Sequence, residues 1–76
     1  MKLRIRDMRE DSDLIQKQLA DYLNVTQQTY SRYETGELSP SLTTMEKLAY
    51  FYDTSVDYLM GITNVKEPYR RNKKTK

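Results

Sequence analysis

The sequence predicts an all-α protein made of five short helices and a basic, extended C-terminal tail. Apolar residues recur at helical spacing along most of the chain, and no stretch alternates apolar and polar residues as a strand does. Capping and turn residues separate the helical stretches. The 76 residues leave room for one small, compact domain, because chains of this size bury only about 60% of their unfolded surface.

The first two helices are predicted at residues 3–10 and 16–23. Their apolar residues fall on one side of each helix, as packing against a common core requires. These residues are Leu3, Ile5, Met8, Leu19, Ala20 and Leu23. The second helix should end at Asn24, because asparagine is one of the few residues that tolerate a left-handed backbone.

The third helix is predicted between Thr26 and Gly36. The Thr26 hydroxyl can accept a hydrogen bond from a free amide one turn on, and glycine commonly follows the last helical residue. Around the helix axis, Tyr30 and Tyr33 fall on the side that should be buried. The opposite side carries Gln28, Ser31 and Arg32, with Gln27 at its exposed rim and Thr29 next to the core side.

The last two helices are predicted at residues 42–52 and 56–60. Ser41 and Ser55 stand where they can cap them, and Gly61 closes the second. The apolar residues of the longer helix form a stripe that should face the core. This stripe consists of Leu42, Met45, Leu48, Ala49 and Tyr52.

Helical periodicity stops after residue 61, so residues 1–61 are expected to form the domain and 62–76 a flexible tail. The domain carries seven Lys and Arg residues against ten Asp and Glu residues, a balance of −3, whereas the tail carries six against one, a balance of +5. A basic tail attracts polyanions such as nucleic acid. The alternative is a solvated tail that only aids solubility.

Several classes of function are excluded or disfavoured. The absence of cysteine and histidine rules out a disulfide framework and the usual zinc ligand sets. There is no glycine-rich phosphate loop and no convincing carboxylate pair, so we expect no catalytic activity, cofactor, metal or small-molecule ligand. The N-terminus lacks a signal peptide, and the longest apolar run, from Leu48 to Tyr52, is too short to span a bilayer. A soluble, cytoplasmic protein is expected.

The polar side of the third helix has the chemistry of DNA recognition. A glutamine amide can bond adenine N6 and N7, arginine can bond guanine O6 and N7, and a threonine methyl can touch a thymine methyl. These residues stand near the start of the helix, which is the end that enters a major groove. The alternative is that Gln27 and Gln28 are ordinary surface residues.

The spacing of the second and third helices, joined by residues 24–26, is that of a helix-turn-helix. The chain also carries the pattern Leu-x-Gln-x-x-Leu-Ala-x-x-Leu, followed by Val-Thr, a polar helix, Glu-x-Gly, Pro-Ser-Leu and Leu-Ala. In this it resembles the XRE family of DNA-binding domains, the class that includes phage lambda repressor and Cro, over about residues 3–61. The resemblance implies a five-helix lambda-repressor-like fold that binds double-stranded DNA as a transcriptional regulator. A dimeric repressor on a palindromic operator is the expected form.

The resemblance also implies roles for individual residues. Base contacts fall at Gln27, Gln28, Thr29 and Arg32. Phosphate and positioning contacts fall at Gln16, Lys17, Thr26, Ser31, Thr35 and Gly36. Gln16 is further implied to steady the first residue of the recognition helix. Arg9 and Glu34 correspond to a partly buried ion pair that ties the first helix to the end of the third.

Two departures from the family pattern and one alternative function remain. Ile15 stands where the family has a Ser or Thr cap, which should weaken the start of the second helix by about 1 kcal/mol. Glu37 and Leu38 stand where the family often has basic residues for phosphates. The same fold could instead serve as an antitoxin or adaptor that binds a protein partner. The aromatic residues Tyr50, Phe51, Tyr52 and Tyr58 are expected to be mostly core, and the alternative is a homodimer interface.

Overall fold

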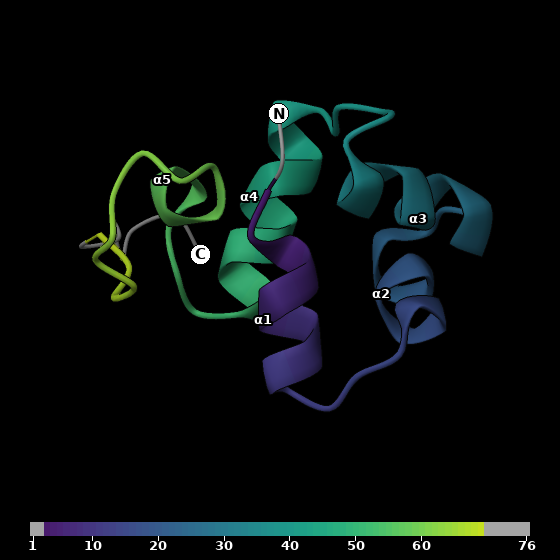
Figure 1. Cartoon of the computed structure of the whole chain (residues 1–76), viewed down its shortest axis with the longest axis horizontal. Coiled ribbons are helices and arrows are strands. Elements are labelled where there is room, and N and C mark those ends of the chain that lie inside the picture. Colours follow the sequence, from purple (N-terminus) through teal and green to yellow (C-terminus); the bar gives the residue numbers. More distant parts are fainter. Residues whose placement is uncertain (1–2, 70–76) are drawn as a thin grey trace, which may run out of the picture.

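The structure, a computed structural model, describes residues 3–69, and five helices make up its ordered framework (Figure 1). In the view of Figure 1, α1 and α4 lie in the middle, α2 and α3 lie on one side, and α5 lies on the other. The helices are α1 (Ile5–Asp11), α2 (Gln16–Leu23), α3 (Gln27–Thr35), α4 (Leu42–Phe51) and α5 (Val56–Leu59). No strand occurs within residues 3–69, and the all-α prediction is confirmed.

Short polar side chains begin three of the helices, as predicted. The hydroxyl of Thr26 accepts from the Thr29 amide at 3.1 Å, and Ser41 and Ser55 make the same bond at the start of α4 and α5. Asn24 ends α2 with a φ of 61°, and Gly36 ends α3 with a φ of 86°. These left-handed positions let the chain reverse direction immediately after each helix.

The core lies where the helices meet and holds most of the residues that the sequence assigned to it. Tyr30, Ile5, Leu19, Leu48 and Leu59 are among its fully buried side chains. One assignment was wrong, because the side chain of Leu42 is 66% exposed. Leu42 is the first residue of α4, and the buried stripe of that helix begins only one turn later, at Met45.

The aromatic residues near α4 and α5 divide into two groups. Tyr52 and Tyr58 are half-buried and pack against the core, as expected. Tyr50 and Phe51 are exposed instead, and the Phe51 ring lies 4.8 Å from that of Tyr22 on α2. Their side of α4 faces away from the core, so these two side chains are not buried.

Residues 62–69 contain no helix, and side-chain hydrogen bonds hold them against the helical body. Arg4 donates to the Thr63 carbonyl at 3.1 Å, and buried Thr54 donates to the Lys66 carbonyl at 2.6 Å. The Tyr69 hydroxyl donates to the Asp57 carboxylate at 2.7 Å. The remaining tail, with five of its six basic residues, lies outside the described residues.

No helix within the described part of the chain is long and apolar enough to cross a membrane.

Candidate nucleic-acid interface

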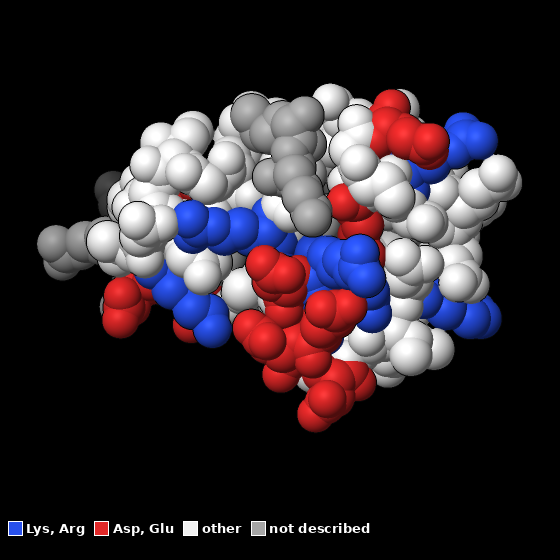
Figure 2. Space-filling view, in the orientation of Figure 1, with Lys and Arg blue, Asp and Glu red and all other residues white. Residues whose placement is uncertain are grey.

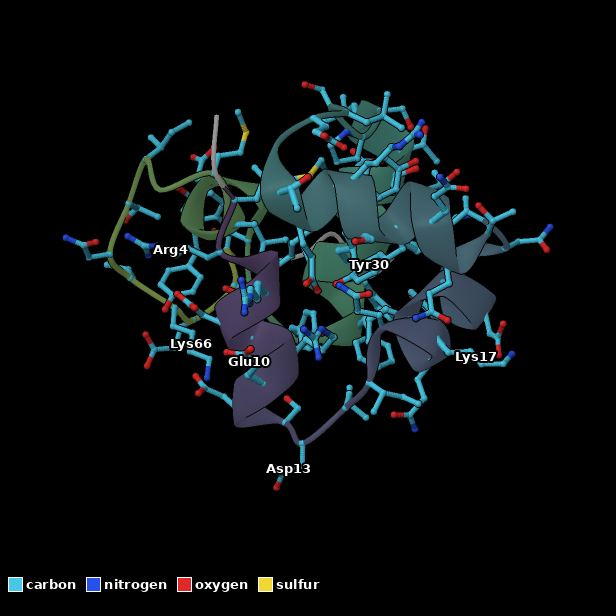
Figure 3. All side chains as sticks on the ribbon, turned by 45° about the vertical axis from the view of Figure 1, so that its right-hand side comes forward. Arg4, Glu10, Asp13, Lys17, Tyr30 and Lys66 are labelled. Carbon is cyan, nitrogen blue, oxygen red and sulfur yellow. The ribbon has the colours of Figure 1, made fainter. Side chains whose placement is uncertain are left out.

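The outer face of α3 and the start of α2 together form an open hollow of about 430 Å³. Gln27, Gln28 and Arg32 are exposed, and Ser31 is half-buried. On the inner side of α3, Tyr30 (Figure 3) and Tyr33 are buried, and their ring centroids lie 6.3 Å apart in an edge-to-face arrangement. The residues that line the hollow are Gln16, Gln27, Gln28, Ser31, Arg32 and Glu37.

The predicted ion pair between α1 and the end of α3 is present. Arg9 Nε lies 2.7 Å from one oxygen of the Glu34 carboxylate, and Arg9 Nη2 lies 3.2 Å from the other. A third donor, Arg9 Nη1, bonds the Leu14 carbonyl at 2.9 Å. Only 3% of the Glu34 side chain is exposed, so its carboxylate is a buried charge, and the Arg9 guanidinium pairs with both of its oxygens.

Gln16 joins the same network at the edge of the hollow. Its amide nitrogen donates to the Glu34 carboxylate at 3.1 Å, so its contact to α3 is at the last turn rather than at the first residue. An amide nitrogen carries two hydrogens, and one remains for another acceptor. The network therefore orients Gln16 while leaving it able to bind a ligand.

The surroundings of the Arg9–Glu34 pair shift the pKa of Glu34 and of two nearby tyrosines, Tyr30 and Tyr52. Burial alone would raise the pKa of Glu34, but hydrogen bonds from Arg9 and Gln16 outweigh it and hold the pKa below its usual value. Burial, and then the neighbouring negative charge of Glu34, raise the pKa of Tyr52 to about 12. Burial and Glu34 raise the pKa of Tyr30 as well. Glu34 is thus charged at neutral pH, and the two phenols are neutral.

Five of the residues predicted to contact DNA lie outside the hollow. Lys17 points away from the molecule on α2 and pairs with Asp21 at 3.1 Å (Figure 3). The Thr26 hydroxyl bonds that of Thr29 at 2.9 Å, which leaves the Thr29 methyl as its free part. Thr35 and Gly36 both donate to the Arg32 carbonyl and so shape the end of α3.

A family model described as helix-turn-helix matches residues 5–59, which cover α1 to α5. The chain belongs to this family. Its XRE-type helix-turn-helix consists of α2, the turn at Asn24, and α3. The expectation that the domain is not an enzyme is confirmed, because the family is one of transcriptional regulators without enzymatic activity.

Known proteins with this helix-turn-helix include regulators from bacteria and phages. The cryptic phage CTXphi transcriptional repressor RstR of Vibrio cholerae is 42% identical over 66 residues, which cover 84% of this chain and 60% of the repressor. The uncharacterized HTH-type transcriptional regulator YobD of Bacillus subtilis is 34% identical over 73 residues, covering 96% of this chain and 65% of the regulator. The chain thus spans less than two thirds of the length of these relatives.

A solved structure agrees with the helix-turn-helix fold. The crystal structure of a transcriptional regulator from Listeria innocua superimposes with a TM-score of 0.70 and 25% identity. The superposition covers 93% of this chain and 68% of the regulator.

Among the residues that line the hollow, Glu37 is the one for which the sequence predicted no favourable contact with DNA. Its carboxylate lies 3.8 Å from Arg32 Nε, and both side chains are more than half exposed. In Figure 2, acidic and basic atoms lie next to each other over the loop that follows α3. A larger acidic group gathers at the lower end of α1, where Figure 3 places Glu10 and Asp13. The signal for Glu37 was its position five residues beyond Arg32, across a glycine that reverses the chain.

Proposed function

We propose that this protein binds double-stranded DNA at specific sequences and regulates transcription, as a repressor, by placing α3 in the major groove. The observation that carries the proposal is the hollow in which Gln16, Gln27, Gln28, Ser31 and Arg32 face one open space. Amide groups near the start of α3, and a guanidinium further along its exposed face, suit base edges. Such a role belongs in the cytoplasm, with the DNA.

Within this proposal, the residues divide into two groups. Gln27, Gln28 and Arg32 read bases, with the Thr29 methyl beside them. Gln16, Ser31 and Lys17 bind phosphates. Main-chain and short polar groups at Thr26, Thr35 and Gly36 hold the DNA backbone beside these contacts. Phosphate contacts fix register on the duplex, and base contacts select the sequence.

The proposed form on DNA is a homodimer on a palindromic operator. Two recognition helices of a dimer enter successive major grooves about 34 Å apart. The described part of the chain measures 34 × 26 × 24 Å, so two copies side by side fit this spacing. The exposed aromatic residues Tyr22, Tyr50 and Phe51 offer apolar area for the contact between copies.

Selection of duplexes from a random DNA pool, followed by binding measurements with Gln28→Ala, tests the function. Loss of one good base contact costs about 1–3 kcal/mol, so affinity for the selected duplex should fall about ten- to hundredfold, with affinity for random DNA nearly unchanged. Gln18→Ala is the matched control, because this exposed glutamine on α2 bonds the Ile15 amide and lies outside the hollow. Sedimentation of the complex should give two chains per duplex.

Two outcomes would contradict the proposal. Equal affinity for all duplexes would remove sequence recognition. A tight complex with another protein, together with no salt-dependent DNA binding, would favour the antitoxin or adaptor function instead.

A further inference from the structure

The loop after α3 places Glu37 beside Arg32 by backbone hydrogen bonds. The Arg32 carbonyl accepts from Gly36 N at 3.1 Å, from Leu38 N at 3.2 Å and from the Thr35 hydroxyl at 3.2 Å. The Thr35 hydroxyl in turn accepts from the Glu37 amide at 3.4 Å. Because the loop is tied to the main chain of Arg32 itself, the turn brings the two side chains within reach of each other.

The contact is on the Nε side of the guanidinium, and within residues 3–69 the two terminal nitrogens have no hydrogen-bond partner. The Glu37 carboxylate lies 3.8 Å from Arg32 Nε. The two terminal nitrogens of arginine are the pair that bonds guanine O6 and N7. One guanidinium can therefore serve Glu37 on its Nε side and a base on its outer edge at the same time.

The two kinds of DNA acceptor differ in charge at this point. A guanine edge carries no net charge, so sharing Arg32 with Glu37 brings less repulsion there than a phosphate would. A phosphate on the same guanidinium would bring a second anion close to the carboxylate, which is unfavourable. The pair therefore penalises phosphate binding by Arg32 more than it penalises base binding.

We propose that Glu37 is a specificity-determining residue: paired with Arg32, it orients the guanidinium toward a base edge and opposes non-specific binding to the DNA backbone. This inference rests on the proposed function. It assigns a positive role to a carboxylate that otherwise only weakens attraction to DNA. Because both side chains are exposed, the pair contributes little to folding stability, and its effect is on which DNA site the protein prefers.

Glu37→Gln tests the inference by removing the charge while keeping the shape. Two duplexes of equal length serve as probes, one selected by the wild-type protein and one of random sequence. Affinity for the random duplex should rise about three- to tenfold, and its salt slope should steepen by about one, because Arg32 can then bind one additional phosphate. Affinity for the selected duplex should stay within about twofold, so selectivity falls.

Two comparisons separate pairing from bulk charge. Asp11→Asn removes the same charge from the exposed end of α1, and its selectivity should equal that of the wild type. In an Arg32→Ala background, Glu37→Gln should bring a much smaller rise in affinity for random DNA, because Glu37 acts through Arg32.

The inference is overturned if Glu37→Gln leaves selectivity at the wild-type value, or if its effect on random DNA is as large without Arg32. In both cases the wild-type protein still prefers its selected duplex, so the proposed function stands. A wild-type protein without any sequence preference would overturn both.

Discussion

At the scale of single residues, Glu34 connects three parts of the molecule. Its carboxylate accepts from Arg9 of α1 and from Gln16 of α2, while its own backbone belongs to the last turn of α3. A buried carboxylate is tolerated only when it is paired and hydrogen-bonded. Glu34 therefore helps to fix the orientation of α3 relative to α1 and α2, together with the packing of Tyr30 and Tyr33 in the core.

Removal of Arg9 should destabilise the protein far more than removal of its neighbour Arg6. Arg9→Ala leaves the buried Glu34 charge unpaired, which costs about 3–5 kcal/mol. Arg6→Ala breaks an exposed pair with Glu10, which is worth about 0–1 kcal/mol. Urea unfolding of both variants measures the difference, and equal losses would contradict a structural role for the buried pair.

Acid should weaken the fold through Glu34. The pKa of Glu34 is lower in the folded protein than its ordinary value of 4.5, so the unfolded chain takes up the proton first as the pH falls. This contribution to stability is present above pH 4.5 and is lost as the pH falls through the folded pKa. An NMR titration of the Glu34 carboxyl should give a midpoint below 4.5. In Glu34→Gln, unfolding should depend less on pH over this range, and a native midpoint above the ordinary value would refute the assignment.

At the scale of helices, capping determines where α2 and α3 begin. Thr26 caps α3 with its hydroxyl, whereas Ile15 has no acceptor to offer the amides of α2. The other half of a capping box is already present, because the Gln18 side chain accepts from the Ile15 amide at 2.9 Å. The backbone of Ile15 is extended, as an N-cap requires, and its side chain is largely exposed.

Ile15→Ser should therefore stabilise the protein by about 0.5–1 kcal/mol, since serine completes the capping box without changing the backbone. Thermal unfolding measures the increase. Thr26→Ala, which removes an existing cap, is the matched control and should cost about 1 kcal/mol. A serine variant that melts at or below the wild-type temperature would show that the start of α2 does not limit stability.

At the scale of the whole molecule, the tail combines two roles that truncation can separate. Residues 62–69 are bonded to α5, to Thr54 and to Arg4. In Figure 3, Arg4 and Lys66 both lie on the side of the molecule that this segment covers. Most of the positive charge comes later, in residues 70–76.

Deletion of residues 70–76 should weaken binding to all duplexes by a similar factor and reduce the salt slope, because up to five cations are lost. The melting temperature should stay unchanged, since the bonds to Lys66 and Tyr69 remain. Deletion of residues 66–76 should also lower the melting temperature, because buried Thr54 loses its hydrogen bond to the Lys66 carbonyl. If both truncated proteins bound DNA as tightly as the intact chain, the tail would serve only solubility.

The sequence alone determined the helices, their caps and the faces they bury. Thr26, Asn24 and Gly36 marked the ends of α2 and α3 correctly because capping depends on residues within one turn. The periodicity of Tyr30 and Tyr33 identified the buried side of α3, and with it the polar side. Leu42 showed the limit of this reasoning, since a stripe does not reveal where the core ends.

Apart from the Arg9–Glu34 pair, which the family resemblance implied, only the tertiary structure decided which side chains meet. The contacts of Gln16 with Glu34, of Arg4 with Thr63 and of Thr54 with Lys66 join residues 18, 59 and 12 positions apart. The pairing of Glu37 with Arg32 depends on the path of a loop whose backbone returns to the carbonyl of Arg32. Periodicity and capping are local, so they indicate which face of a helix is buried or exposed. The partner on that face depends on how all the helices pack together, and that packing turns a polar helix into a candidate DNA-binding site.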